Sequence, residues 1–135
     1  MGARYLLDTN ICIYIRQHRP MKVLERFENL SPGEAVLSVI TYGELVYGAV
    51  KSQNRIERLK NLREMAQLLP VLPLPEDAGT RYGEIRADLE SKGQRIGNND
   101  LWIAAHAKAA GLTLVTNNEN EFRRVSGLTI QNWTL

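Results

Sequence analysis

The stretch Leu6-Leu7-Asp8-Thr9-Asn10 decides the fold, because an apolar run ends there in a carboxylate and an amphipathic segment follows at once. Residues 4–7 are predicted to form a short buried strand, and residues 9–16 a short helix. Open α/β sheets bind their ligands at the carboxyl ends of their strands, and Asp8 falls at such an end. Asp8 is therefore a candidate metal ligand or catalytic group, although aspartate is also a favoured residue at a helix N-cap.

The composition is that of one globular domain, and we expect residues 1–135 to form it. The chain has 44% hydrophobic and 24% charged residues, and its net charge of only +2 excludes a strongly basic nucleic-acid-binding protein. No apolar run approaches the ~20 residues of a bilayer span, and no signal peptide is visible. The single cysteine, Cys12, cannot form an internal disulfide. Together these features predict a cytoplasmic protein with no membrane partner.

Strand-like and helix-like segments alternate along the chain. Strands are predicted at residues 4–7, 35–39, 70–75, 112–116 and 128–130. Helices are predicted at residues 9–16, 21–30, 41–51, 53–69, 76–92, 98–110 and 119–124. This alternation predicts an α/β fold in which a parallel sheet is covered by helices on both faces.

Further carboxylates fall close to other strand and helix junctions. Glu44 lies in the helix after the second strand, Asp100 opens a later helix, and Glu119 and Glu121 follow the strand at residues 112–116. Right-handed crossovers bring the carboxyl ends of parallel strands to one edge of the sheet. Acidic residues that are far apart in the sequence can therefore meet at that edge.

Each of these acids also has a purely structural interpretation. Thr41 and Glu44 have the spacing of a capping box, in which the glutamate bonds to the backbone of the threonine. On a helix, however, Glu44 would face apolar or small residues such as Ile40 and Gly48, so its charge would need a partner. For Glu44 the two interpretations are balanced. Asp100, taken alone, is better explained as a helix N-cap.

A cluster of carboxylates would suit a hard divalent cation. Mg²⁺ and Mn²⁺ bind oxygen ligands, whereas Cys12 and His106 do not have the spacing of a zinc site. A cation of this kind lowers the pKa of bound water and stabilises the charge that develops in phosphodiester cleavage. One carboxylate can instead orient or deprotonate the attacking water.

Several segments carry a family resemblance through their order and spacing. They are Leu6-Leu7-Asp8-Thr9-Asn10-Ile11, Ser38-Val39-Ile40-Thr41-Tyr42-Gly43-Glu44-Leu45, Ile96-Gly97-Asn98-Asn99-Asp100, Leu114-Val115-Thr116-Asn117-Asn118 and Glu121-Phe122. Each segment alone is a weak signal. In this order they resemble the PIN-domain ribonucleases, and within them the VapC toxins of bacterial type II toxin–antitoxin pairs. The resemblance extends over nearly the whole chain.

This resemblance implies a three-layer α/β/α sandwich with a central, mainly parallel sheet, built as a single PIN domain over residues 1–135. It also implies Mg²⁺- or Mn²⁺-dependent endonucleolytic cleavage of RNA, with transfer RNA among the candidate substrates, which would arrest translation and growth. The implied partners are the RNA, a VapB-type antitoxin and a second copy of the chain in a homodimer. Larger toxin–antitoxin assemblies would form on operator DNA.

The resemblance also implies a site. Asp8, Glu44 and Asp100 match the first three acidic positions of the family, with Asp8 and Asp100 as the direct metal ligands. Thr9 and Asn10 are expected to orient Asp8 and the waters near the metal without binding the metal themselves. Thr116, Asn118 and Glu119 are expected to have the same supporting role.

The fourth acidic position departs from the common pattern. Many PIN domains have an aspartate two residues after the threonine of the strand, where this chain has the neutral Asn118. Glu121 matches the acid of the closer toxins and is preferred here as the fourth catalytic residue, with Glu119 as a substitute. The neutral Asn118 also leaves a second hypothesis open. In that hypothesis the chain is a catalytically weak binding module that acts with its antitoxin in promoter autoregulation.

Overall fold

The chain folds around a five-stranded sheet in which every neighbouring pair of strands is parallel. In the computed structural model, which describes residues 2–135, the strand order is β3-β2-β1-β4-β5. The strands are β1 (Tyr5–Leu7), β2 (Ala35–Ser38), β3 (Val71–Leu72), β4 (Thr113–Val115) and β5 (Ile130–Gln131). The first strand therefore lies at the centre of the sheet, between β2 and β4.

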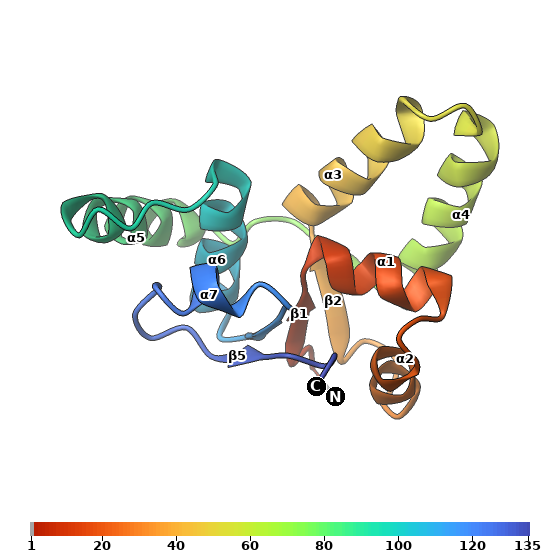
Figure 1. Cartoon of the computed structure of the whole chain (residues 1–135), viewed down its shortest axis with the longest axis horizontal. Coiled ribbons are helices and arrows are strands. Elements are labelled where there is room, and N and C mark those ends of the chain that lie inside the picture. Colours follow the sequence, from red (N-terminus) through yellow and green to blue (C-terminus); the bar gives the residue numbers. More distant parts are fainter. Residues whose placement is uncertain (1) are drawn as a thin grey trace.

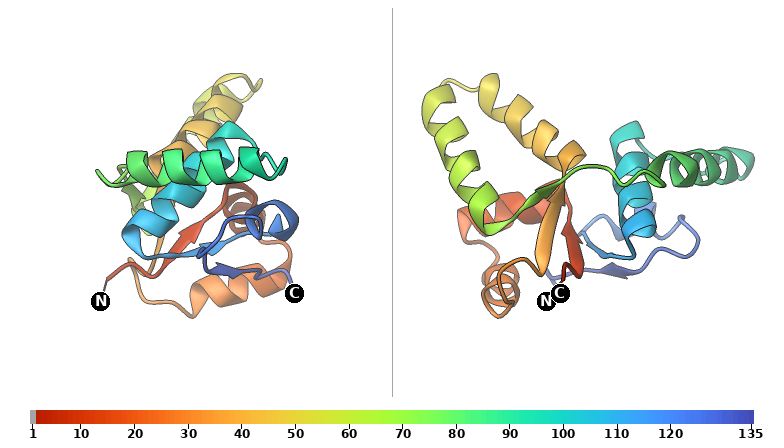
Figure 2. Two further views of the ribbon diagram at one scale, coloured as in Figure 1. Left: turned by 90° about the vertical axis from the view of Figure 1, so that its left-hand side faces the viewer. Right: turned by 180° about the vertical axis from the view of Figure 1, so that it is seen from behind.

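Helices cover both faces of this sheet, as Figures 1 and 2 show. They are α1 (Thr9–Gln17), α2 (Met21–Glu28), α3 (Val39–Val50), α4 (Arg55–Leu68), α5 (Ala78–Ser91), α6 (Asn98–Ala110) and α7 (Glu119–Phe122). The α1–α4 layer lies on one face and the α5–α7 layer on the other. The expected three-layer α/β/α sandwich is confirmed, and its sheet is fully parallel.

Alternate residues of the central strand supply two separate hydrophobic cores. Leu7 packs with Leu37 and Val115 under the α1–α4 layer, whereas Leu6 packs with Val36 and Leu114 under the α5–α7 layer. Successive side chains of a strand point to opposite faces of the sheet, so a strand between two helical layers is apolar throughout. This explains why the short apolar run before Asp8 marks the centre of the sheet.

The outer strands are shorter than the sequence predicts. The segment 70–75 pairs only at Val71 and Leu72, because prolines flank these two residues and cannot donate to a sheet. The last strand forms at Ile130–Gln131, slightly later than the predicted 128–130. Among residues 2–135, no helix is long and apolar enough to cross a membrane.

The start of α3 corrects the predicted capping box. The helix begins at Val39, and its cap is Ser38, whose Oγ accepts a hydrogen bond of 3.1 Å from the backbone N–H of Ile40. Thr41 lies inside the helix, and its buried hydroxyl has no hydrogen-bond partner among the described residues. The capping-box interpretation of Glu44 was therefore wrong, and the Glu44 carboxylate is available for other contacts.

Asp100 is not a helix cap either. The cap position of α6 is Gly97, which makes no side-chain capping bond, and Asp100 is the third residue of the helix. Asp8, by contrast, does cap α1 through a hydrogen bond from the backbone N–H of Thr9. The helix-cap interpretation is therefore correct for Asp8 and wrong for Asp100.

Ser38 has a second partner in the buried His106. The Nδ1 atom of His106 lies 2.9 Å from the Ser38 hydroxyl, and burial lowers the pKa of the imidazole. The Nε2 atom of His106 has no partner among residues 2–135. His106 is therefore a structural histidine that links α6 to the start of α3.

Ser38→Ala should lower the free energy of unfolding by about 2 kcal/mol, because it removes a helix cap and a partner of a buried imidazole. Thr41→Val is the matched control. It replaces a buried hydroxyl that makes no hydrogen bond, so its effect should stay within about 0.5 kcal/mol. Urea denaturation of both variants measures the difference. A larger loss for Thr41→Val than for Ser38→Ala would restore Thr41 as the cap.

Candidate metal centre

Asp8 is held at the carboxyl end of the central strand by hydrogen bonds to both of its carboxylate oxygens. Oδ1 accepts from the backbone N–H of Thr9 at 2.7 Å, and Oδ2 accepts from the Thr116 hydroxyl at 2.8 Å. The residue is only 6% exposed. Each oxygen can accept more than one bond, so helix capping does not exhaust the carboxylate.

Glu44 reaches the same edge of the sheet from α3. Its Oε1 accepts a 2.6 Å hydrogen bond from the Thr9 hydroxyl, and its Oε2 accepts a 3.3 Å bond from the Asn99 amide. Thr9 therefore contacts both Asp8 and Glu44, one through its backbone and the other through its side chain. Thr9 can thus hold both carboxylates in a fixed orientation.

Asp100 faces these carboxylates from the first turn of α6. Burial raises its pKa to about 7, and the charges of Asp8, Glu121 and Glu44 and hydrogen bonding to Glu121 act in the same direction. The pKa of Asp8 is also raised, chiefly by burial, although its hydrogen bonds from Thr116 and Thr9 oppose the shift. The structure thus brings all four preferred acids within electrostatic reach of one another.

The two candidates for the fourth acid have different surroundings. The charge of Glu121 raises the pKa of both Asp8 and Asp100. Its Oε2 accepts a 3.1 Å hydrogen bond from the Asn118 amide. Glu119 instead forms a 2.8 Å ion pair with Arg123. Its Oε2 accepts from Asn132, and the hydrogen bonds from Asn132 and Arg123 lower its pKa. The geometry therefore favours Glu121.

Asn118 connects two parts of the site. Its backbone N–H donates to the Thr116 hydroxyl at 2.9 Å, and that hydroxyl donates to Asp8. Its side chain donates to Glu121. The neutral amide in the usual place of an acid thus orients the nearby glutamate. Asn10 lies exposed in the first turn of α1 and takes no part in these hydrogen bonds.

Asn99 is a site residue to which the sequence reasoning gave no role. It lies directly before Asp100 in the first turn of α6, and it joins this helix to Glu44 on α3. Its only signal in the sequence was its place inside the segment Asn98-Asn99-Asp100. The partner on α3 is 55 positions away along the chain, so local patterns could not reveal the contact.

The donor set fits a hard divalent cation. None of the charges that act most strongly on Asp8 and Asp100 is positive, so a cation would relieve the repulsion among these oxygen ligands. Among residues 2–135, no group of three His, Cys, Asp or Glu side chains could by itself hold a metal ion. Mg²⁺ keeps several waters and usually takes one or two carboxylates directly, so it does not require three protein ligands.

Comparison with known proteins identifies the family. Residues 5–128 match the PIN domain. The chain is 42% identical over 130 residues to Ribonuclease VapC2 of Haemophilus influenzae. The aligned region covers 96% of this chain and 98% of that protein. The chain belongs to the VapC ribonucleases of the PIN-domain family.

Two further VapC relatives are informative. The tRNA(fMet)-specific endonuclease VapC of Shigella flexneri is 42% identical over 131 residues, covering 97% of this chain and 98% of that protein. The crystal structure of DNA-bound VapBC from Salmonella typhimurium contains a chain with a TM-score of 0.90 and 40% identity, covering 97% of this chain and 98% of its own. PIN-domain ribonucleases generally depend on a divalent metal.

Burial of Asp100 and its repulsion by the other acids predict the pH dependence of stability without metal. The pKa of Asp100 is higher in the folded state than in the unfolded state, so the folded protein holds a proton that the unfolded chain releases. In EDTA, the free energy of unfolding should therefore fall as the pH rises from about 4 to about 7. Urea denaturation at about pH 5 and about pH 8 measures this fall.

Asp100→Asn should flatten this dependence and stabilise the metal-free protein at about pH 8. Asp88→Asn serves as the control, because Asp88 pairs with Lys92 on the exposed side of α5. An unchanged pH dependence in Asp100→Asn would show that the proton is held elsewhere.

Proposed function

We propose that this chain is a divalent-metal-dependent endoribonuclease, the toxin of a VapBC-type pair, and that Asp8, Glu44, Asp100 and Glu121 form its catalytic site. Asp8 and Asp100 are the direct ligands of Mg²⁺ or Mn²⁺ in this proposal. The observation that carries it is the convergence of four acids from separate elements. Burial and the neighbouring acidic charges raise the pKa values of Asp8 and Asp100, with no positive charge prominent among the causes.

The surrounding residues prepare these acids for phosphodiester hydrolysis. A divalent ion held by Asp8 and Asp100 would lower the pKa of bound water and stabilise the charge that develops on the phosphate. Thr9 and Thr116 fix both oxygens of Asp8, so its orientation is set before RNA binds. Glu44 is held by Thr9 and Asn99, and from there it orients the attacking water or accepts its proton.

Transfer RNA is the substrate class that we propose to test first. This choice is supported by the Shigella flexneri relative, whose name specifies tRNA(fMet) and which shares 42% identity with this chain. A site of action in the cytoplasm, where transfer RNA is used, belongs to the same proposal.

A VapB-type antitoxin is the proposed protein partner. The DNA-bound VapBC structure supports this partner and an assembly of toxin and antitoxin on DNA. A homodimer of this chain and binding to operator DNA belong to the same proposal. An antitoxin arginine or lysine that entered the acidic pocket would compete with the metal for the carboxylates. The same carboxylates would then serve both catalysis and inhibition.

The alternative of a catalytically weak binding module is not favoured. It arose because Asn118 replaces an acid, but Asn118 donates a hydrogen bond to Glu121, which supplies a carboxylate nearby. The curated relatives carry the names ribonuclease and endonuclease. Operator binding is therefore proposed as an additional property of the complex.

Asp8→Asn should abolish RNA cleavage while the fold is kept, because it removes a charged metal ligand but preserves the shape of the side chain. The assay uses purified initiator and elongator tRNAs with Mg²⁺ or Mn²⁺, and with EDTA. The control is Asp77→Asn, which changes an exposed aspartate that pairs with Arg81. Cleavage that persists at the wild-type level in Asp8→Asn, or in EDTA, would refute the mechanism.

The fourth acid can be identified with a pair of isosteric variants. Glu121→Gln should lower kcat by about 10- to 100-fold, whereas Glu119→Gln should leave it nearly unchanged. Glu119 pairs with Arg123, so its loss should affect stability slightly and cleavage little. The reverse order of effects would assign the fourth position to Glu119. Circular dichroism and thermal unfolding confirm that both variants are folded.

A further inference from the structure

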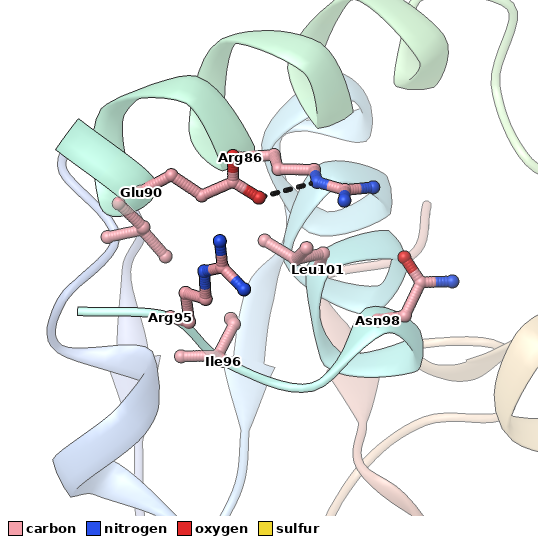
Figure 3. Close-up of a pocket in the computed structure, with 7 residues that line it drawn as sticks. Arg86, Glu90, Arg95, Ile96, Asn98 and Leu101 are labelled. Atoms are coloured by element: carbon pink, nitrogen blue, oxygen red, sulfur yellow. Dashed lines mark hydrogen bonds and ion pairs between the residues drawn. The ribbon is translucent and has the colours of Figure 1, made fainter. Parts of the chain in front are cut away.

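A small pocket lies between the last turns of α5, the loop that follows it and the first turn of α6 (Figure 3). Its volume is about 140 Å³. The apolar part of its lining consists of Leu89, Ile96 and Leu101, of which Leu89 and Leu101 are buried. None of the residues that line this pocket belongs to the acidic site.

One side of the pocket rim is fixed by side-chain hydrogen bonds. Arg86 Nε donates to Glu90 Oε2 at 2.8 Å, and Arg86 Nη1 donates to the Tyr82 hydroxyl at 2.9 Å. The Tyr82 hydroxyl in turn donates to Asn98 Oδ1. Tyr82 is itself stacked on Trp102, with ring centroids 4.0 Å apart. The rim is therefore ordered before any ligand binds.

The other side of the rim is Arg95. Its guanidinium points towards the Arg86–Glu90 pair across the pocket (Figure 3). Among residues 2–135 this guanidinium forms no ion pair and donates no hydrogen bond, although its charge helps to lower the pKa of Glu90. Because Glu90 is already paired with Arg86, the positive charge of Arg95 is available to a ligand.

The pocket adjoins both elements that carry the later acids. The carbonyl oxygen of Arg95 accepts a 2.9 Å hydrogen bond from Arg124, which follows the short helix that bears Glu121. On the other side, Asn98 and Leu101 line the pocket from the same helical turn that directs Asp100 to the acidic site. A strand of RNA at the acidic site would therefore pass close to this pocket.

We propose that this pocket binds one unpaired nucleobase of the RNA, next to the phosphodiester that is cleaved; the inference rests on the ribonuclease function proposed above. The volume is far below the ~300–1,000 Å³ of sites that enclose a whole small ligand, so it suits a single planar group. A base needs an apolar surface, donors and acceptors for its edge, and a planar partner such as guanidinium. Leu89, Ile96 and Leu101 supply the apolar surface, and the Glu90 carboxylate supplies an acceptor. Arg95 supplies donors and the planar guanidinium.

The mixed character of the rim favours a base over a phosphate. A phosphate in this pocket would lie beside the carboxylate of Glu90, whereas the edge of a base offers hydrogen-bond donors to that carboxylate as well as acceptors to Arg95. The guanidinium of arginine can also stack on the face of a base, which the ammonium of lysine does less well.

The test measures binding in EDTA, so that cleavage does not interfere. Fluorescence anisotropy gives the Kd of four single-stranded RNA homopolymers of about ten nucleotides, and of an abasic strand of the same length. The wild-type protein should prefer one homopolymer. Arg95→Ala should weaken binding of that homopolymer about tenfold, and should weaken the abasic strand only slightly, as the loss of one positive charge does. Arg95→Lys should resemble Arg95→Ala, because it keeps the charge but loses the planar group.

The control is Arg58→Ala, which removes an equal charge from an exposed arginine on α4, on the opposite side of the molecule. It should alter the binding of all strands slightly and equally. If Arg95→Ala weakens the abasic strand as much as the others, or if Arg95→Lys restores full affinity, Arg95 contacts the backbone and the proposal is overturned. Cleavage by the wild-type protein with Mn²⁺ is measured separately, so failure of the ribonuclease proposal is distinguished from failure of the base pocket.

Discussion

The site depends on keeping the Asp8 carboxylate buried and oriented at the end of the central strand. Burial and the neighbouring acids both raise its pKa, and the hydrogen bonds from Thr9 and Thr116 oppose this effect. Those two donors come from the start of α1 and the end of β4, which flank the same strand end. The parallel pairing of β1 with β4 is thus what allows a threonine 108 positions away to hold Asp8.

The same arrangement explains why the remaining acids come from helices on different sides of the sheet. Glu44 approaches on α3, whose start is fixed by Ser38, and Asp100 approaches on α6, which is tied to Ser38 through His106. One buried hydroxyl therefore links the two helices that carry catalytic candidates. The energy that orders these groups comes from packing and hydrogen bonds outside the site, while the acids themselves repel one another.

Much of the fold was predictable because short apolar strands alternate with amphipathic helices, and because a strand buried on both faces is apolar throughout. The predictions failed where two local patterns competed. The Thr41–Glu44 spacing fits a capping box, but Ser38 already caps the helix, which begins at Val39. The edge strands were overestimated because apolar composition does not show which backbone groups find a partner.

The sequence by itself determined the order of the acids along the chain, the apolar strand before Asp8 and the family resemblance of these segments. Only the tertiary structure decided which carboxylates face one another. It turned Glu121 towards Asp100 and Glu119 towards Arg123, and it joined Asn99 to Glu44. The physical reason is that helix and strand periodicity depends on neighbours in the chain, whereas these contacts depend on how separate elements cross at the edge of the sheet.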